Sequence, residues 1–170
     1  MTDHVLRARE LFLDDTNAYG CAEVTLIVLQ EALGLPDAGD SSPAMALNGG
    51  IAYSGGTCGA ITGAALAAGR LAGRCLADHS EAKREARRLV QELMTGFRAE
   101  FGSVDCRHLT GYDLDAPGQH EAFIADGTWR VNCMRQIEYT VGRLTHLARE
   151  AGWASPPAGD SPTVPPVPAR

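Results

Sequence analysis

The sequence lacks several features that would place it in a common class of protein. It has no apolar run of about 20 residues, the length that crosses a bilayer, so no membrane span is expected. Its first residues contain no uninterrupted apolar stretch of the kind found in secretory signals, and the expected location is cytoplasmic. Its formal net charge is −6, whereas nucleic-acid-binding proteins present basic surfaces, so no nucleic-acid partner is expected.

Short functional motifs are also missing. No C-x-x-C pair occurs, which excludes a zinc ribbon and a thioredoxin-like motif, and no C-x-x-C-H site for haem attachment occurs either. Neither a P-loop nor a G-x-G-x-x-G turn is present, so nothing indicates nucleotide binding. The chain does contain five cysteines, which in the cytoplasm should be reduced, bound to metal or transiently redox-active.

The composition is that of an ordinary soluble globular domain, with 45% apolar and 21% charged residues. We expect one domain over residues 1–153, long enough to bury a sizeable core. Residues 154–170 hold six of the nine prolines among small and polar residues, so we expect a flexible, disordered tail there.

Apolar periodicity predicts an all-α fold, a single compact bundle of about five helices with a glycine-rich loop. The last helix should turn an apolar stripe inward. The expected helix ranges are 3–15, 21–34, 58–76, 80–101 and 128 or 133 to 151. Ser80 is the expected cap of the fourth helix. A short helical turn is expected at 106–109, a surface loop at 37–46, and irregular structure at 111–127.

The third predicted helix is unusually rich in alanine and glycine. Each interior glycine costs about 1 kcal/mol of helix propensity relative to alanine, so several in one helix suggest that other helices pack closely against its backbone. The same small-residue surface could serve a contact between subunits, and a homodimer is therefore one expectation.

A glycine-rich stretch, GGIAYSGGTCGAITG at residues 49–63, leads into this third helix. Gly55 and Gly56 indicate a tight approach of the backbone to another group. Cys58 follows them at the predicted helix start, where free N–H groups and the helix dipole favour a thiolate over a thiol.

Four cysteines share this setting, because each follows a break and stands at or near a predicted helix start. They are Cys21, Cys58, Cys106 and Cys133, separated by 37, 48 and 27 residues. Cys75 lies late in the third helix, where the dipole disfavours a thiolate, and is interpreted as a packing residue. Helix starts that converge could stabilise an anionic thiolate or metal–thiolate group. The alternative to a shared cysteine site is a helical interaction module in which the cysteines are incidental.

The sequence around these cysteines resembles a known family. The segments Gly20–Leu26 (GCAEVTL), Gly55–Gly63 (GGTCGAITG) and Phe101–Gly111 (FGSVDCRHLTG), followed by Cys133, are similar to the redox-active proteins named for their C…GCAxxG…C…C pattern. The resemblance covers roughly residues 17–147. It implies a small, mostly helical redox-active domain whose four cysteines act together.

One block departs from the family pattern, since it reads Cys58-Gly59-Ala60-x-x-Gly63 where the family has Gly-Cys-Ala-x-x-Gly. A similar domain occurs in split-Soret cytochromes, where an iron–sulfur centre accompanies the haems. Because this chain has no haem attachment motif, the resemblance implies only the iron–sulfur part.

The leading hypothesis is that the four cysteines converge and ligate an iron–sulfur cluster, [2Fe–2S] in type, that exchanges single electrons with an unidentified redox partner protein. Gly55, Gly56 and Gly59 would let backbone N–H groups reach the cluster sulfurs. One alternative is a thiol–disulfide oxidoreductase in which Cys21 and Cys58 form the catalytic pair, with pKa values lowered by the helix starts. The other is a structural zinc ion held by the four thiolates.

Overall fold

The computed structural model describes residues 3–153, so the expectation for the tail at 154–170 lies outside the described residues. Within this range the chain forms seven α-helices and one 3-10 helix, and the only extended pairing is a single isolated bridge. The prediction of an all-α fold is confirmed. The elements are α1 (Asp3–Phe12), α2 (Cys21–Ala32), η1 (Ser42–Leu47), α3 (Gly59–Cys75), α4 (His79–Phe101), α5 (Cys106–Thr110), α6 (Gln119–Asp126) and α7 (Thr128–Glu150).

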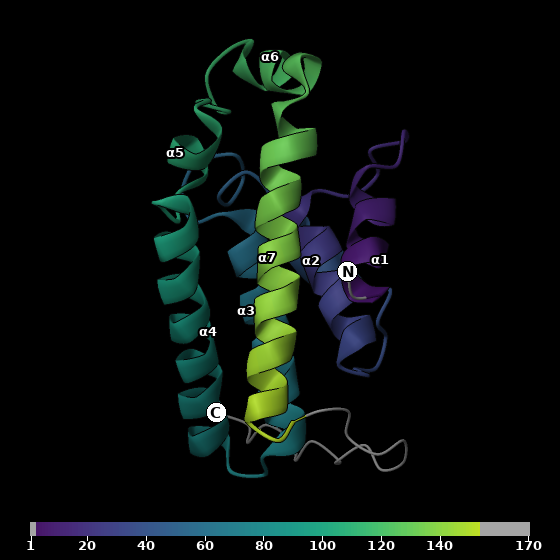
Figure 1. Ribbon diagram of the computed structural model, residues 1–170, viewed down its shortest axis with the longest axis vertical. Coiled ribbons are helices and arrows are strands. Elements are labelled where there is room, and N and C mark those ends of the chain that lie inside the picture. Colours follow the sequence, from purple (N-terminus) through teal and green to yellow (C-terminus); the bar gives the residue numbers. More distant parts are fainter. Residues whose placement is uncertain (1–2, 154–170) are drawn as a thin grey trace, which may run out of the picture.

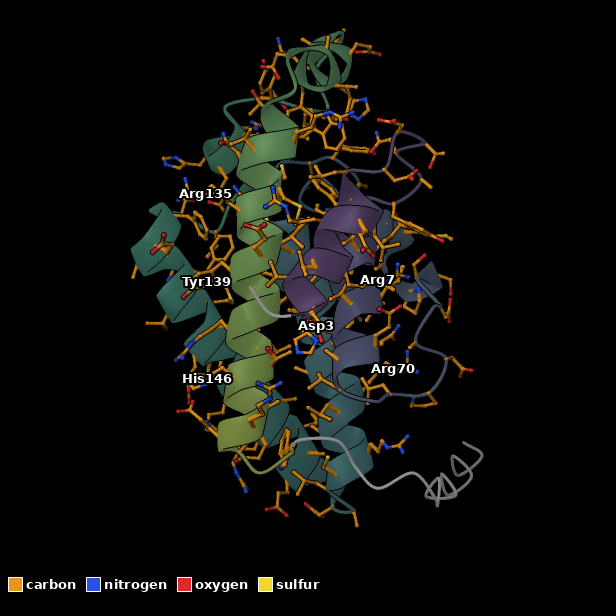
Figure 2. The ribbon with its side chains drawn as sticks, turned by 45° about the vertical axis from the view of Figure 1, so that its right-hand side comes forward. Asp3, Arg7, Arg70, Arg135, Tyr139 and His146 are labelled. Carbon is orange, nitrogen blue, oxygen red and sulfur yellow. The ribbon has the colours of Figure 1, made fainter. Side chains whose placement is uncertain are left out.

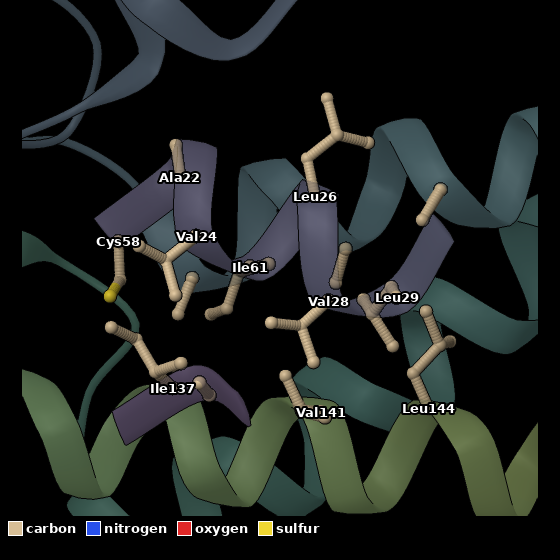
Figure 3. Close-up of a cluster of buried hydrophobic side chains, with 14 of the residues drawn as sticks. Ala22, Val24, Leu26, Val28, Leu29, Cys58, Ile61, Ile137, Val141 and Leu144 are labelled. Atoms are coloured by element: carbon tan, nitrogen blue, oxygen red, sulfur yellow. The ribbon is translucent and has the colours of Figure 1, made fainter. Parts of the chain in front are cut away.

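The long helices α3, α4 and α7 run along the length of the molecule, with α1 and α2 beside them and the short α5 and α6 towards one end (Figure 1). Helix α2 is the central element, because its residues from Ala22 to Gln30 are all buried. Figure 3 shows Val24, Val28 and Leu29 of α2 pointing towards the α7 side chains Ile137, Val141 and Leu144. The predicted inner stripe of the last helix is therefore confirmed.

Glycines in α3 bring α2 and α3 very close together. A Cβ atom on Gly63 would lie 2.3 Å from the carbonyl oxygen of Ala22, and one on Gly59 would lie 2.3 Å from the Cys21 sulfur. Such distances are too short for any side chain, so only glycine permits this contact. The expectation of close packing against the third helix is confirmed, and it sets Cys21 next to the start of α3.

Helix α4 begins one residue earlier than predicted and has a different cap. The Asp78 carboxylate accepts a hydrogen bond from the Glu81 backbone N–H at 2.7 Å, the interaction that defines an N-cap. The prediction of Ser80 as the cap is therefore wrong, and Ser80 lies inside the first turn.

One other local prediction is wrong, because the segment 111–127 is not wholly irregular: α6 occupies Gln119–Asp126. The segment 37–46 lies mostly at the surface, as predicted, although its second half forms most of η1. Helix α7 begins at Thr128, where the Asp126 carboxylate accepts the Thr128 backbone N–H at 2.7 Å. Cys133 consequently lies in the second turn of α7 and not at a helix start.

Over residues 3–153, no helix is both long enough and apolar enough to cross a bilayer.

Candidate cysteine site

Three of the four predicted cysteines line one cavity of about 220 Å³ at the end of the bundle near α6. Cys21 comes from the start of α2, Cys106 from the start of α5 and Cys133 from α7. Most of the remaining wall is aromatic or apolar: Phe12, Ala18, Tyr53, Leu114, Phe123, Ile124 and Trp129. The rest of the wall includes the polar side chains of Glu23, Asn48 and His120, so residues far apart in the sequence contribute thiols to a single pocket of mixed polarity.

Cys58, the fourth cysteine, is tied to Cys106 through the backbone. Thr57 and Asp105 form an antiparallel bridge, in which the Cys58 N–H donates to the Val104 carbonyl at 2.8 Å and the Cys106 N–H donates to the Gly56 carbonyl at 2.7 Å. In this pairing Cys58 and Cys106 are diagonal neighbours on the same face, a relation that separates residues by about 7–8 Å. The glycine-rich loop therefore fixes the position of Cys58 relative to the pocket.

The sulfur of Cys21 lies among backbone amides. The backbone amides of Gly49, Ala22, Cys21 and Gly59 each lower the pKa of this thiol, because they stabilise the charged thiolate. Burial outweighs them, so the pKa of Cys21 is nevertheless raised. This amide group is the feature of the pocket best suited to negative charge on sulfur.

The four thiols share one electrostatic environment. Burial raises the pKa of Cys106 to about 12, with the neighbouring Cys21 charge adding to the effect. Burial also raises the pKa of Cys58 and of Cys133 well above the usual thiol range, and the charges on other pocket cysteines raise both further. The expectation that helix starts lower the pKa of Cys21 and Cys58 is therefore wrong, because burial is the larger effect.

The sulfur atoms do not gather at one point in this conformation. Within residues 3–153, no three Cys, His, Asp or Glu side chains are arranged to hold a metal ion. The Cys58 sulfur instead points towards α7 (Figure 3) and donates to the Gln136 side-chain oxygen at 3.5 Å. The predicted convergence is thus reduced to a shared pocket: three cysteines line it and the fourth is buried beside it.

The three glycines predicted at the site have different surroundings. The N–H groups of Gly55 and Gly56 donate to the carbonyls of Gly49 and Gly50, at 3.0 and 3.2 Å, within the loop itself. Only the Gly59 N–H is directed at a cysteine sulfur, that of Cys21. Contact of the three with a cofactor stays a prediction.

A polar network beside Cys21 was not predicted from the sequence. The Asn48 side-chain oxygen accepts the Ala22 N–H at 2.9 Å, and its amide nitrogen donates to the buried Glu23 carboxylate at 2.9 Å. Glu23 also accepts the Gly20 N–H at 2.9 Å. Glu23, three residues after Gly20, carries a recognisable capping signal, whereas nothing in the local sequence marks Asn48.

A left-handed turn holds the loop against Cys21. All five residues from Gly49 to Tyr53 have φ between 50° and 79°, a conformation that costs a non-glycine residue about 1–2 kcal/mol. The turn delivers the Gly49 N–H to the Cys21 sulfur and packs the Tyr53 ring on His120, with centroids 4.9 Å apart. Strain of this kind persists where the surrounding structure holds a functional conformation in place.

Cys75 lies apart from the other four cysteines. It is the last residue of α3, partly buried against the core, whereas Cys58 immediately precedes the first residue of that helix. The 17 residues of α3 span about 25 Å at 1.5 Å per residue. Cys75 therefore serves as an internal control for any property attributed to the pocket cysteines.

The fold and the pocket define a small all-helical protein that brings widely spaced cysteines to one end of a bundle. The chain belongs to the family described as "Putative redox-active protein (C_GCAxxG_C_C)", whose family model matches residues 19–147. This match confirms the resemblance seen in the cysteine segments. Comparison with curated proteins and with solved structures found no match.

Proposed function

We propose that this protein holds an iron–sulfur cluster of the [2Fe–2S] type in the cysteine pocket and passes single electrons to a partner protein. The observation that carries the proposal is the placement of Cys21, Cys106 and Cys133 in the wall of one cavity, with Cys58 fixed beside it by the bridge to the Cys106 segment. Membership of a redox-active family supports the same class of chemistry.

The residues of the pocket suit such a group. Thiolates are the usual ligands of iron–sulfur clusters, and the chain supplies four thiols to this region. The cavity of about 220 Å³ is several times the roughly 30 Å³ that one water takes up, so a group larger than a single ion has room there. Cys21, Cys58, Cys106 and Cys133 would hold the cluster, which when bound supplies one-electron oxidation and reduction.

The other pocket residues would control the surroundings of the thiolates. The apolar side chains of Phe12, Phe123 and Trp129 limit access of water to the sulfurs. The amides directed at Cys21 stabilise negative charge on its sulfur. Both effects are among the means by which proteins set the reduction potential of a cluster.

Two observations favour this proposal over the alternatives. A thiol–disulfide enzyme needs a thiolate near neutral pH without help from a metal, whereas burial raises the pKa of every pocket cysteine; cluster ligands lose their protons through binding to the metal itself. A single zinc ion needs four sulfurs about 3.8 Å apart around one point, from tetrahedral bonds of about 2.3 Å. A cluster spreads its ligands over two irons, which tolerates wider separations.

The test is cluster content after anaerobic purification and reconstitution with iron and sulfide. We expect a coloured protein that contains iron and acid-labile sulfide in equal amounts. Single variants Cys21→Ser, Cys106→Ser and Cys133→Ser should each lose most of the colour and iron, whereas the matched control Cys75→Ser should keep both.

Two results would overturn the proposal. One is a colourless protein that takes up no iron under reconstitution. The other is equal loss of iron in Cys75→Ser and in the pocket variants, since that would place the metal outside the pocket.

A further inference from the structure

A second cavity, of about 180 Å³, lies between the end of α4, helix α5 and the first half of α7. Its wall carries cationic and amide side chains together with apolar ones. The lining residues are Phe101, His108, Leu109, Asn132, Arg135 and Gln136. None of them is acidic, so the cavity has donors for an anion and no lining carboxylate to repel one.

The arginine of this cavity lies over one aromatic ring. The Arg135 guanidinium lies 5.9 Å from the centre of the Phe101 ring, and that ring packs edge-on against Tyr139 at 5.5 Å. Figure 2 shows Arg135 and Tyr139 one above the other along α7. The nearest carboxylate partner, Glu100, is 3.9 Å away in an exposed pair, an interaction of little strength. The guanidinium is therefore oriented and still able to bind an anion.

Gln136 connects the cavity to the cysteine site. Its side chain is 96% buried, since only 4% of its surface is exposed, and its oxygen accepts the hydrogen bond from the Cys58 sulfur. No hydrogen bond from its amide nitrogen is found within residues 3–153, and this nitrogen is not among the buried, unpaired polar atoms, so it keeps access to the cavity that the residue lines. An accessible amide N–H can donate to an acceptor that binds in the cavity.

We propose that this cavity binds a small oxyanion, held by the Arg135 guanidinium and the Gln136 amide, with His108 and Asn132 at its rim. Charge-assisted hydrogen bonds from a planar guanidinium are well suited to such ligands. The Gln136 amide would contact both the bound anion and Cys58, so an anion bound here would alter the surroundings of that cysteine. This anion site is separate from the proposed cluster site, and anion binding does not require a bound cluster.

The experiment is titration of the iron-free full-length chain with inorganic phosphate, followed by amide NMR shifts at constant ionic strength. We expect saturable shifts confined to residues of α5 and the first half of α7. Arg135→Gln should weaken binding on the order of tenfold or more, the loss typical of a charged hydrogen bond. The control Arg143→Gln removes the same charge two turns further along α7 and should leave binding unchanged.

A second variant tests the buried amide. Gln136→Met keeps the size of the side chain and removes its donor, and it should also weaken phosphate binding. Absence of saturable shifts in the unmodified protein would overturn the proposal, as would equal weakening by Arg135→Gln and Arg143→Gln. Because the titrated protein contains no iron, a lack of phosphate binding would refute the anion site alone and would leave the cluster proposal untouched.

Discussion

Replacing Gly63 by alanine should destabilise the protein although alanine is the better helix former. The new Cβ would lie 2.3 Å from the carbonyl oxygen of Ala22, 3.1 Å from its carbonyl carbon and 3.2 Å from its Cα. These are backbone atoms of α2, so the overlap is relieved only by moving α2 away from α3. Overpacking of this kind costs about 1–3 kcal/mol, against a gain in helix propensity of about 1 kcal/mol.

Gly69 provides the matched control, because it lies in the same helix and a Cβ there would have no atom within 4 Å. Gly69→Ala should therefore raise the free energy of unfolding by about 0.5–1 kcal/mol. Both variants carry the same propensity gain, so the difference between them isolates the cost of separating α2 from α3, which we expect to be about 1–3 kcal/mol.

Urea unfolding followed by far-UV circular dichroism measures both free energies. For a chain of this size each kcal/mol corresponds to a shift in melting temperature of about 2–4 °C, which gives an independent check. If Gly63→Ala proved as stable as Gly69→Ala, the close contact between α2 and α3 would be wrong, and with it the placement of Cys21 beside the start of α3.

Three further predictions concern the cap of α4, the network beside Cys21 and the buried thiols. Asp78→Ala should lower the free energy of unfolding by about 1 kcal/mol in urea titrations, whereas Ser80→Ala should leave it unchanged; the reverse order would contradict the observed cap. Asn48→Ala leaves the Ala22 N–H without its partner and should cost about 1–3 kcal/mol by the same assay; an unaltered stability would show the network to be dispensable. Because burial raises the pKa of Cys106 to about 12, above the roughly 8.5 of an unfolded thiol, the unfolded chain loses its proton first and the stability of the metal-free protein should fall as pH rises from about 8.5 towards 12. Cys106→Ser should reduce that slope, and an unchanged slope would refute the assignment.

Local patterns in the sequence were sufficient for most of the helices. The apolar spacing of α7 predicts the buried positions Ile137, Val141 and Leu144, because a long helix on a core repeats its buried residues at a fixed period. Helix α6 was not predicted from the sequence because it is short, buries only Phe123 and follows the turn-forming pair Pro117-Gly118.

The candidate site was predictable in its residues but not in its geometry. Cysteine spacing and the family resemblance single out the three thiols that line the cavity and the fourth buried beside it, yet the ionisation of those thiols depends on burial that no local pattern reveals. Cys133 lies in the second turn of α7 because the helix begins at Thr128, the earlier of the two predicted starts, where the Asp126 carboxylate accepts the Thr128 N–H. Asn48 acts through Ala22 and Glu23, contacts that exist only once the loop is folded against α2.

The position of the iron can be located by anomalous diffraction at the iron absorption edge from anaerobically grown crystals. We expect an iron peak inside the cavity, bonded to sulfurs of Cys21, Cys58, Cys106 and Cys133. Crystals without iron after reconstitution, or with iron bound at Cys75 or at surface histidines, would contradict this expectation.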